Sequence, residues 1–129
     1  MVSIGDAELE VLKVLWEHGP NTVREVNGLL EAQGHTWAYT TVMTMLNRLR
    51  EKGVVGAERV GNANRFKAVL SRDRIVRLEL SKLMDRLCGG GASPLMLALV
   101  EEGRFDQREI AEFRALLDRL EKEQGPDRD

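Results

Sequence analysis

The segment that decides the fold is Thr36–Lys52, which reads TWAYTTVMTMLNRLREK. At 100° per residue its apolar side chains fall on one stripe, which predicts a helix with one buried face; these residues are Val42, Met45, Leu46 and Leu49. The opposite face carries Thr40, Met43, Thr44, Asn47 and Arg48. Short hydrogen-bonding side chains with one guanidinium suit a helix that lies in the major groove of DNA. On the evidence of this helix alone, a DNA-binding face and an ordinary solvated polar surface are equally good interpretations.

Length and composition limit the number of domains and the classes of protein to which the chain can belong. A chain of 129 residues allows one domain, or one small domain with an appendage. No apolar run approaches the roughly 20 residues that cross a bilayer, so no membrane insertion is expected. The acidic N-terminus lacks the apolar stretch of a signal peptide, which predicts a cytoplasmic protein. The single Cys88 cannot form an internal disulfide or a metal site alone, and we expect no metal and no cofactor.

The distribution of charge matters more than the net charge of −2. Residues 1–35 hold six acidic and two basic side chains, whereas residues 36–70 hold six basic and two acidic ones. Phosphate binding requires a local basic surface, and the sum over the chain does not decide it. The positive charge gathers in the helix quoted above and in the segment that follows it.

Two shorter helices are expected before this segment. The first is predicted from Asp6, as its N-cap, to His18, where Gly19-Pro20 ends it. The second opens with Thr22 and Glu25, spaced as a capping box, and ends near Gln33-Gly34. The second and third helices together are typical of a helix-turn-helix, in which the third is the recognition helix.

After Gly53 the pattern changes to that of a β-hairpin. Residues 54–60 are β-prone, residues 61–64 are rich in turn formers, and residues 65–69 alternate apolar and basic. Phe66 and Ala68 fall on one face of the second strand, and Arg65 and Lys67 fall on the other. Such a hairpin beside a helix-turn-helix makes a winged helix, although charges on it could also serve only solubility.

Three further helices are predicted from Arg72 to Cys88, after Ser93-Pro94 and after Asp106. Asp106 and Glu109 are spaced as a capping pair at the start of the last one. The fifth is almost wholly apolar and should be buried, and the sixth has the 3-4-3 spacing of a coiled-coil seam. These helices could fold back onto the first domain or pair with a second copy, and their apolar surface favours pairing. The residues expected at this dimer interface are Leu80, Leu83, Leu87, Leu95, Leu99, Ile110, Phe113 and Leu117.

The predicted fold class is therefore mostly α with a small β-wing. A winged helix-turn-helix DNA-binding domain is expected over residues 1–70, followed by a three-helix dimerisation arm over residues 71–129.

The segments GDAELEVLKVLWE, TVREV and AYTTVMTMLNRLREKGVV resemble the penicillinase-repressor family, the BlaI/MecI/CopY group of bacterial repressors. The resemblance covers nearly the whole chain and is most specific between Tyr39 and Val55. It implies a homodimeric transcriptional repressor whose winged helix binds operator DNA and whose helical arm dimerises.

Two departures from the family limit what the resemblance implies about control. Ala98-Leu99 stands where members under β-lactam sensors carry a cleaved Asn-Phe pair, so the sequence does not predict cleavage there. The tail lacks the Cys-x-Cys motif of copper-responsive members. Two routes of release from DNA remain open. A ligand could bind in the arm, or an upstream sensor or protease could act elsewhere in the chain.

The favoured function is a sequence-specific repressor that binds a palindromic operator as a homodimer. The residues expected at the major groove are Thr40, Thr41, Thr44, Asn47 and Arg48, with Thr41 at the edge and able to bind a phosphate. Those expected on the flanking backbone are Arg59, Asn62, Asn64, Arg65 and Lys67. The alternative is a winged-helix protein-interaction module without sequence-specific DNA binding. No arrangement of nucleophile and base, phosphate loop or metal-spaced cluster predicts an enzyme.

Overall fold

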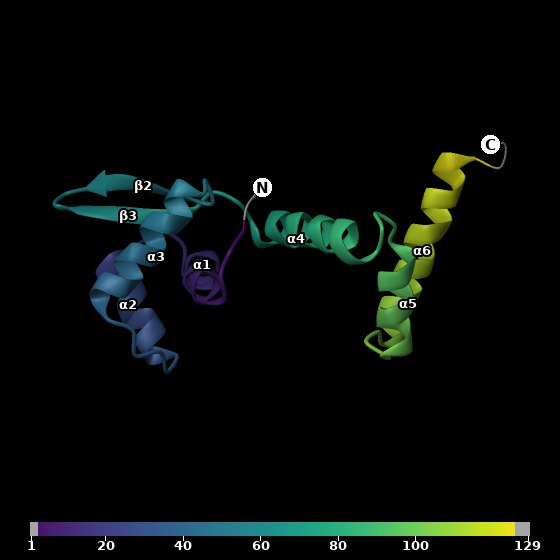
Figure 1. Ribbon diagram of the computed structural model, residues 1–129, viewed down its shortest axis with the longest axis horizontal. Coiled ribbons are helices and arrows are strands. Elements are labelled where there is room, and N and C mark those ends of the chain that lie inside the picture. The colour runs from purple at the N-terminus through teal and green to yellow at the C-terminus, as the bar shows by residue number, and fades with distance from the viewer. Residues whose placement is uncertain (1–2, 126–129) are drawn as a thin grey trace. The chain divides into compact units, whose positions relative to one another are not determined.

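The computed structural model describes residues 3–125, and the chain divides after Glu79 into two compact units. The N-terminal unit is built from three helices and a small sheet (Figure 1). In chain order these are α1 (Asp6–His18), β1 (Asn21–Thr22), α2 (Val23–Ala32), α3 (Tyr39–Glu51), β2 (Val55–Val60) and β3 (Ala63–Ala68). The sheet is antiparallel with strand order β1-β3-β2. This arrangement confirms the predicted winged helix-turn-helix.

The starts of α1 and α2 follow from side chains that cap their free N–H groups. Thr22 Oγ1 accepts from the Glu25 N–H at 3.2 Å, and Glu25 Oε1 accepts from the Thr22 N–H at 2.8 Å, which confirms the predicted capping box. α1 has the predicted bounds, but its N-cap is Gly5 and the choice of Asp6 was wrong. The reason is that the Glu8 carboxylate accepts from the Gly5 N–H at 2.9 Å, which places the cap one residue earlier.

The core of this unit lies where the three helices meet one face of the sheet. The apolar stripe predicted for α3 is buried as expected, and it packs against α1 and α2. Phe66 is the one buried side chain of β3, while its neighbour Lys67 is exposed. The buried apolar residues are Val11, Leu12, Val14, Leu15, Val23, Val26, Leu30, Val42, Met45, Leu46, Leu49, Val54, Val55, Phe66 and Ile75.

The hairpin is tighter than predicted and the sheet has one more strand. β2 and β3 are joined by Gly61 and Asn62 alone, with Val60 opposite Ala63. Gly61 has φ 62°, a conformation that favours glycine in a two-residue turn. The sequence analysis missed β1, whose two residues lie opposite Phe66 and Arg65 of β3. This strand ties the start of α2 to the hairpin.

The start of α4 (Arg72–Leu87) is attached to the N-terminal unit. Trp16 Nε1 donates to the Leu70 carbonyl at 2.9 Å, and the Arg72 guanidinium lies 5.4 Å from the centre of the Trp16 ring. Ile75 is buried with the core of this unit. The first turns of α4 are therefore part of the compact N-terminal unit, whereas the predicted domain boundary falls after residue 70.

The C-terminal unit consists of the rest of α4, α5 (Ser93–Glu101) and α6 (Gln107–Gln124). Asp106 and Glu109 form the predicted capping box, with hydrogen bonds of 2.9 and 3.1 Å. No residue of this unit is buried among those that the structure describes. The predicted burial of the apolar fifth helix, α5, therefore does not occur within one chain. Its exposed side chains include Met96, Leu97 and Val100.

Candidate nucleic-acid interface

The face of α3 opposite the core is open to solvent. Every residue predicted there is exposed: Thr40, Thr41, Thr44, Asn47 and Arg48. Thr44 Oγ1 donates to the Thr40 carbonyl at 2.9 Å, so this side chain is held against its own helix. Glu51 is also exposed at the end of α3. The outward face of α3 therefore carries short polar side chains together with one guanidinium.

One edge of this face lies against the N-terminal turn of α1. Arg48 lines a hollow there together with Glu8 and Lys52. The Lys52 ammonium donates to Glu8 Oε1, and Glu8 is buried. Burial raises the pKa of the Glu8 carboxyl, but hydrogen bonds from Lys52 and the Gly5 N–H, and the charges of Lys52 and Arg48, together lower that pKa below its ordinary value. The structure thus places Arg48 beside an ionised carboxylate, at the margin of the exposed face.

The other edge faces the hairpin across a hollow of about 410 Å³. This hollow brings together Asn47 of α3 with Asn62 and Asn64 of the hairpin, three residues that the sequence analysis assigned to DNA. Its lining also includes residues that were not assigned to DNA from the sequence. These are Thr22 of β1, Val23 and Arg24 at the start of α2, and Tyr39 and Met43 of α3. We call this space, with its lining residues, the helix–hairpin hollow.

The hairpin presents most of its predicted residues to solvent. Arg59, Asn62, Asn64 and Lys67 are exposed. Arg65 differs, because it lies directly opposite Glu58 in the sheet and its Nη2 is 3.1 Å from Glu58 Oε1. Its Nε is buried without a hydrogen-bond partner. A role for Arg65 on DNA stays a prediction, and only its Nη2 is engaged by Glu58.

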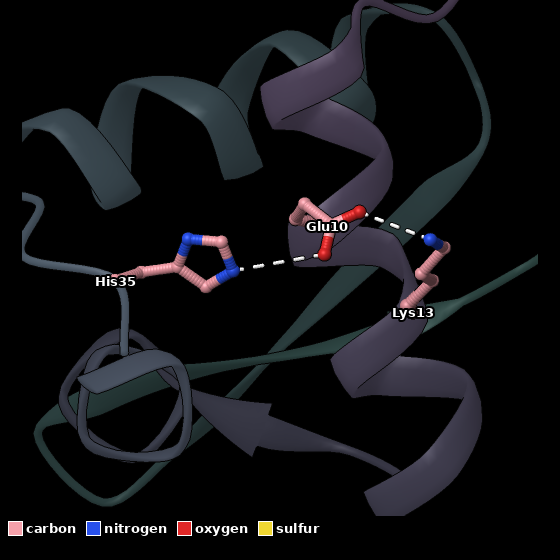
Figure 2. Close-up of polar contacts among 3 residues, drawn as sticks. All are labelled: Glu10, Lys13 and His35. Carbon is pink, nitrogen blue, oxygen red and sulfur yellow. Dashed lines mark hydrogen bonds and ion pairs between the residues drawn. The ribbon is translucent and has the colours of Figure 1, made fainter. Parts of the chain in front are cut away.

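In the turn between α2 and α3, His35 contacts Trp37 of the same turn and Glu10 of α1. The His35 ring stacks on Trp37 with centroids 4.4 Å apart and planes 17° apart. Its Nε2 lies 3.6 Å from Glu10 Oε1, while Glu10 Oε2 is 3.0 Å from Lys13 Nζ (Figure 2). The pKa of Glu10 is lowered, first by the hydrogen bond from Lys13 and despite partial desolvation, with a further contribution from His35. α3 starts at Tyr39, after the extended Ala38, which is three residues later than Thr36, where the predicted helical segment begins.

The residues predicted for the dimer interface lie on exposed or half-buried positions of the C-terminal unit. Leu80, Leu87, Ile110 and Leu117 are exposed, and Leu83, Leu95, Leu99 and Phe113 are half-buried. Phe113 makes an edge-on contact with Phe105, with centroids 4.7 Å apart. The structure therefore leaves an apolar surface here without assigning what covers it.

Two searches of residues 3–125 bear on other functions. No group of three or more His, Cys, Asp or Glu side chains within that range could hold a metal ion. No helix in the same range is both long enough and apolar enough to cross a membrane.

The fold and this surface define a winged-helix protein, in which an exposed polar helix lies beside a basic hairpin. The sequence profile of the penicillinase repressor family matches residues 4–119. The chain belongs to that family. It is 34% identical over 122 residues to a transcriptional regulator BlaI of Mycobacterium tuberculosis, and the match covers 89% of this chain and 88% of that protein.

Two further comparisons agree with this membership. The chain is 29% identical over 115 residues to the penicillinase repressor of Bacillus licheniformis, with 89% of each chain covered. The solution structure of the DNA-binding domain of the repressor BlaI superposes with a TM-score of 0.50 and 35% identity, over 56% of this chain and 87% of that one. These relatives are named as repressors and regulators, which agrees with the expectation that the chain is not an enzyme.

Proposed function

We propose that this chain is a homodimeric transcriptional repressor that binds a palindromic operator in double-stranded DNA. The observation that carries the proposal is the exposed face of α3, where three threonines and an asparagine replace the Lys and Glu of an ordinary solvent face. The related BlaI domain, which is the DNA-binding domain of a repressor, supports the same function. Because a repressor acts on DNA, the proposal places the protein in the cytoplasm.

The proposed binding mode places α3 in the major groove. Thr40, Thr44 and Asn47 would face base edges, because their side chains are exposed on the outward face. Arg48 would reach a guanine or a phosphate at the α1 edge of that face, and Thr41 would bind a phosphate beside it. On the other flank Arg59, Asn62, Asn64 and Lys67 would hold the DNA backbone, and these contacts would supply affinity without sequence preference.

The proposed dimer uses the C-terminal unit. Side chains of α5 and α6 remain largely in water in one chain, and Leu97 and Leu117 are 61% and 63% exposed. Contiguous apolar surface of this kind marks an interface. The 3-4-3 spacing of Ile110, Phe113, Leu117 and Leu120 on α6 suits pairing with a second copy of the same helix. Two-fold symmetry would then require a palindromic operator with half-sites about one helical turn apart, or a multiple of that spacing.

The control proposed for this repressor does not depend on cleavage of the Ala98-Leu99 bond. The Ala98-Leu99 bond lies within helix α5, at the position where family members under β-lactam sensors carry Asn-Phe. A signal would therefore act through a ligand or through an upstream sensor or protease that does not depend on that pair.

The proposal is tested by selecting bound sequences from a random duplex pool with the purified full-length protein at near-physiological salt. A palindromic consensus is expected, together with a dimer by analytical ultracentrifugation at micromolar concentration. Weak, salt-sensitive binding without enrichment would reject the repressor and favour the protein-interaction module. A monomer that still enriches a single half-site would reject the dimer arm alone.

A further inference from the structure

Two large apolar side chains of α3 remain in solvent although the buried stripe of that helix is complete. Tyr39 is 46% exposed and Met43 is 38% exposed. They are four residues apart, so they lie on one row of the helix, and Asn47 continues that row by another four. All three line the helix–hairpin hollow. The row forms the hairpin-side edge of the face that the proposed function assigns to DNA.

Single exposed apolar residues are common on protein surfaces and need no explanation. Here two of them are neighbours, and polar residues surround them: Thr40 and Thr44 on the helix, and Asn62 and Asn64 across the hollow. The Arg24 guanidinium lines the same hollow. Such a surface suits a polyanionic ligand that also carries isolated apolar groups. The basic side chain would face its negative charges, and the apolar strip would contact its apolar groups.

The major groove of DNA offers one such group. Among the four base edges only thymine carries a methyl group there, and apolar side chains recognise it by contact. Adenine, the partner of thymine, is recognised by Asn through a bidentate pair. Met43 and Asn47 lie one helical turn apart on the same edge of α3, so one A·T step could meet both side chains.

We propose that Met43, with Tyr39 beside it, reads a thymine methyl group at the hairpin-side edge of each operator half-site. The inference rests on the proposed DNA-binding function and names two specificity-determining residues for it. Met43 provides an unbranched, polarisable side chain that adapts to the methyl group, and the ring of Tyr39 closes the contact from the next turn of the helix.

The experiment removes the methyl group from the DNA and leaves the base pair intact. A consensus duplex is first obtained from the random pool, and each of its thymines is then replaced in turn by uracil. Binding of the full-length protein is measured by fluorescence anisotropy for the wild type, Met43→Gln and Met43→Leu. Leu78→Gln is the matched control, because Leu78 is a helical apolar residue with a similar exposed fraction, 37%.

We expect uracil at one thymine in each half-site to weaken binding of the wild type roughly fourfold per half-site, the effect of losing one buried methyl group. Met43→Gln should bind the thymine and uracil duplexes equally at that position. Met43→Leu and Leu78→Gln should keep the wild-type ratio, and Tyr39→Ser should reduce it.

The outcomes of this experiment distinguish failure of the methyl-reading role from failure of the proposed repressor function. If the pool yields no consensus, the proposed repressor fails before any uracil is introduced. If a consensus forms but no thymine is sensitive to uracil, or if Met43→Gln keeps the full wild-type sensitivity, the methyl-reading role is wrong and the repressor stands.

Discussion

Replacing Glu8 by Gln should destabilise the N-terminal unit by an amount that can be derived from its contacts. The Glu8 side chain is 9% exposed and holds Lys52, which is 32% exposed, across 44 positions in the sequence. Gln keeps an oxygen for the Gly5 N–H but loses the charge that binds the ammonium. A hydrogen bond to a charged group contributes ~1.5–3 kcal/mol. Since Lys52 can regain water, we expect a loss of about 1–2 kcal/mol.

The assay is urea unfolding followed by tryptophan fluorescence. Both tryptophans of the chain, Trp16 and Trp37, lie in the N-terminal unit, so the signal reports that unit alone. The matched control is Glu17→Gln, on the same helix, whose side chain is 66% exposed and whose carboxylate lies 4.0 Å from the neighbouring His18. That substitution should leave the urea midpoint nearly unchanged.

The same substitution has a predicted pH dependence. Because the pKa of Glu8 is lower in the folded protein than its ordinary value, its charge stabilises the fold above the ordinary carboxyl pKa. That contribution is lost as the pH falls through the lowered pKa. The difference between wild type and Glu8→Gln should therefore be full at pH 7 and should decrease as the pH falls through the lowered pKa of Glu8. Equal midpoints for Glu8→Gln and Glu17→Gln at pH 7, or a difference that persists unchanged below the lowered pKa of Glu8, would refute this reasoning.

Three further predictions concern DNA and assembly. Arg48→Ala should cost roughly 1–3 kcal/mol on the cognate operator if Arg48 reads a base; an equal loss on random duplexes in the same titration would remove that role. Lys67→Ala should weaken binding to all DNA sequences alike and reduce the slope of log affinity against log salt by about one. An unchanged slope would show that Lys67 does not contact a phosphate. Leu117→Glu should convert the dimer to a monomer in analytical ultracentrifugation, while Asp118→Asn beside it should not; a dimer that survives Leu117→Glu would contradict the arm assignment.

Features set by local chemistry could be predicted from the sequence. The capping boxes at Thr22 and Asp106 need only residues three apart, and both occur as predicted. The buried stripe of α3 follows from helical periodicity alone. The position of Arg65 opposite Glu58 was also within reach, because a two-residue turn at Gly61-Asn62 fixes that register.

Other features depend on partners distant in the sequence. β1 has two residues and no pattern of its own, and it exists only because β3 lies beside it. The Lys52–Glu8 pair and the contact of His35 with Glu10 likewise join segments that only the packed fold brings together. Met43 was placed on the exposed side of α3 from the sequence, and Tyr39 could have been placed beside it, but the hairpin opposite them was needed to show the hollow that they line.

The hydrogen bond from Thr44 to the Thr40 carbonyl has a consequence for base recognition. A threonine hydroxyl has one hydrogen to donate, and this bond uses it. With the bond kept on DNA, Thr44 can offer only lone pairs, which match the amino groups of adenine and cytosine in the major groove. It then has no free hydrogen to donate to the carbonyl oxygens of guanine and thymine. In the proposed complex Thr44 would therefore act as an acceptor only, and a neutral side chain would have the base preference of a carboxylate without its charge.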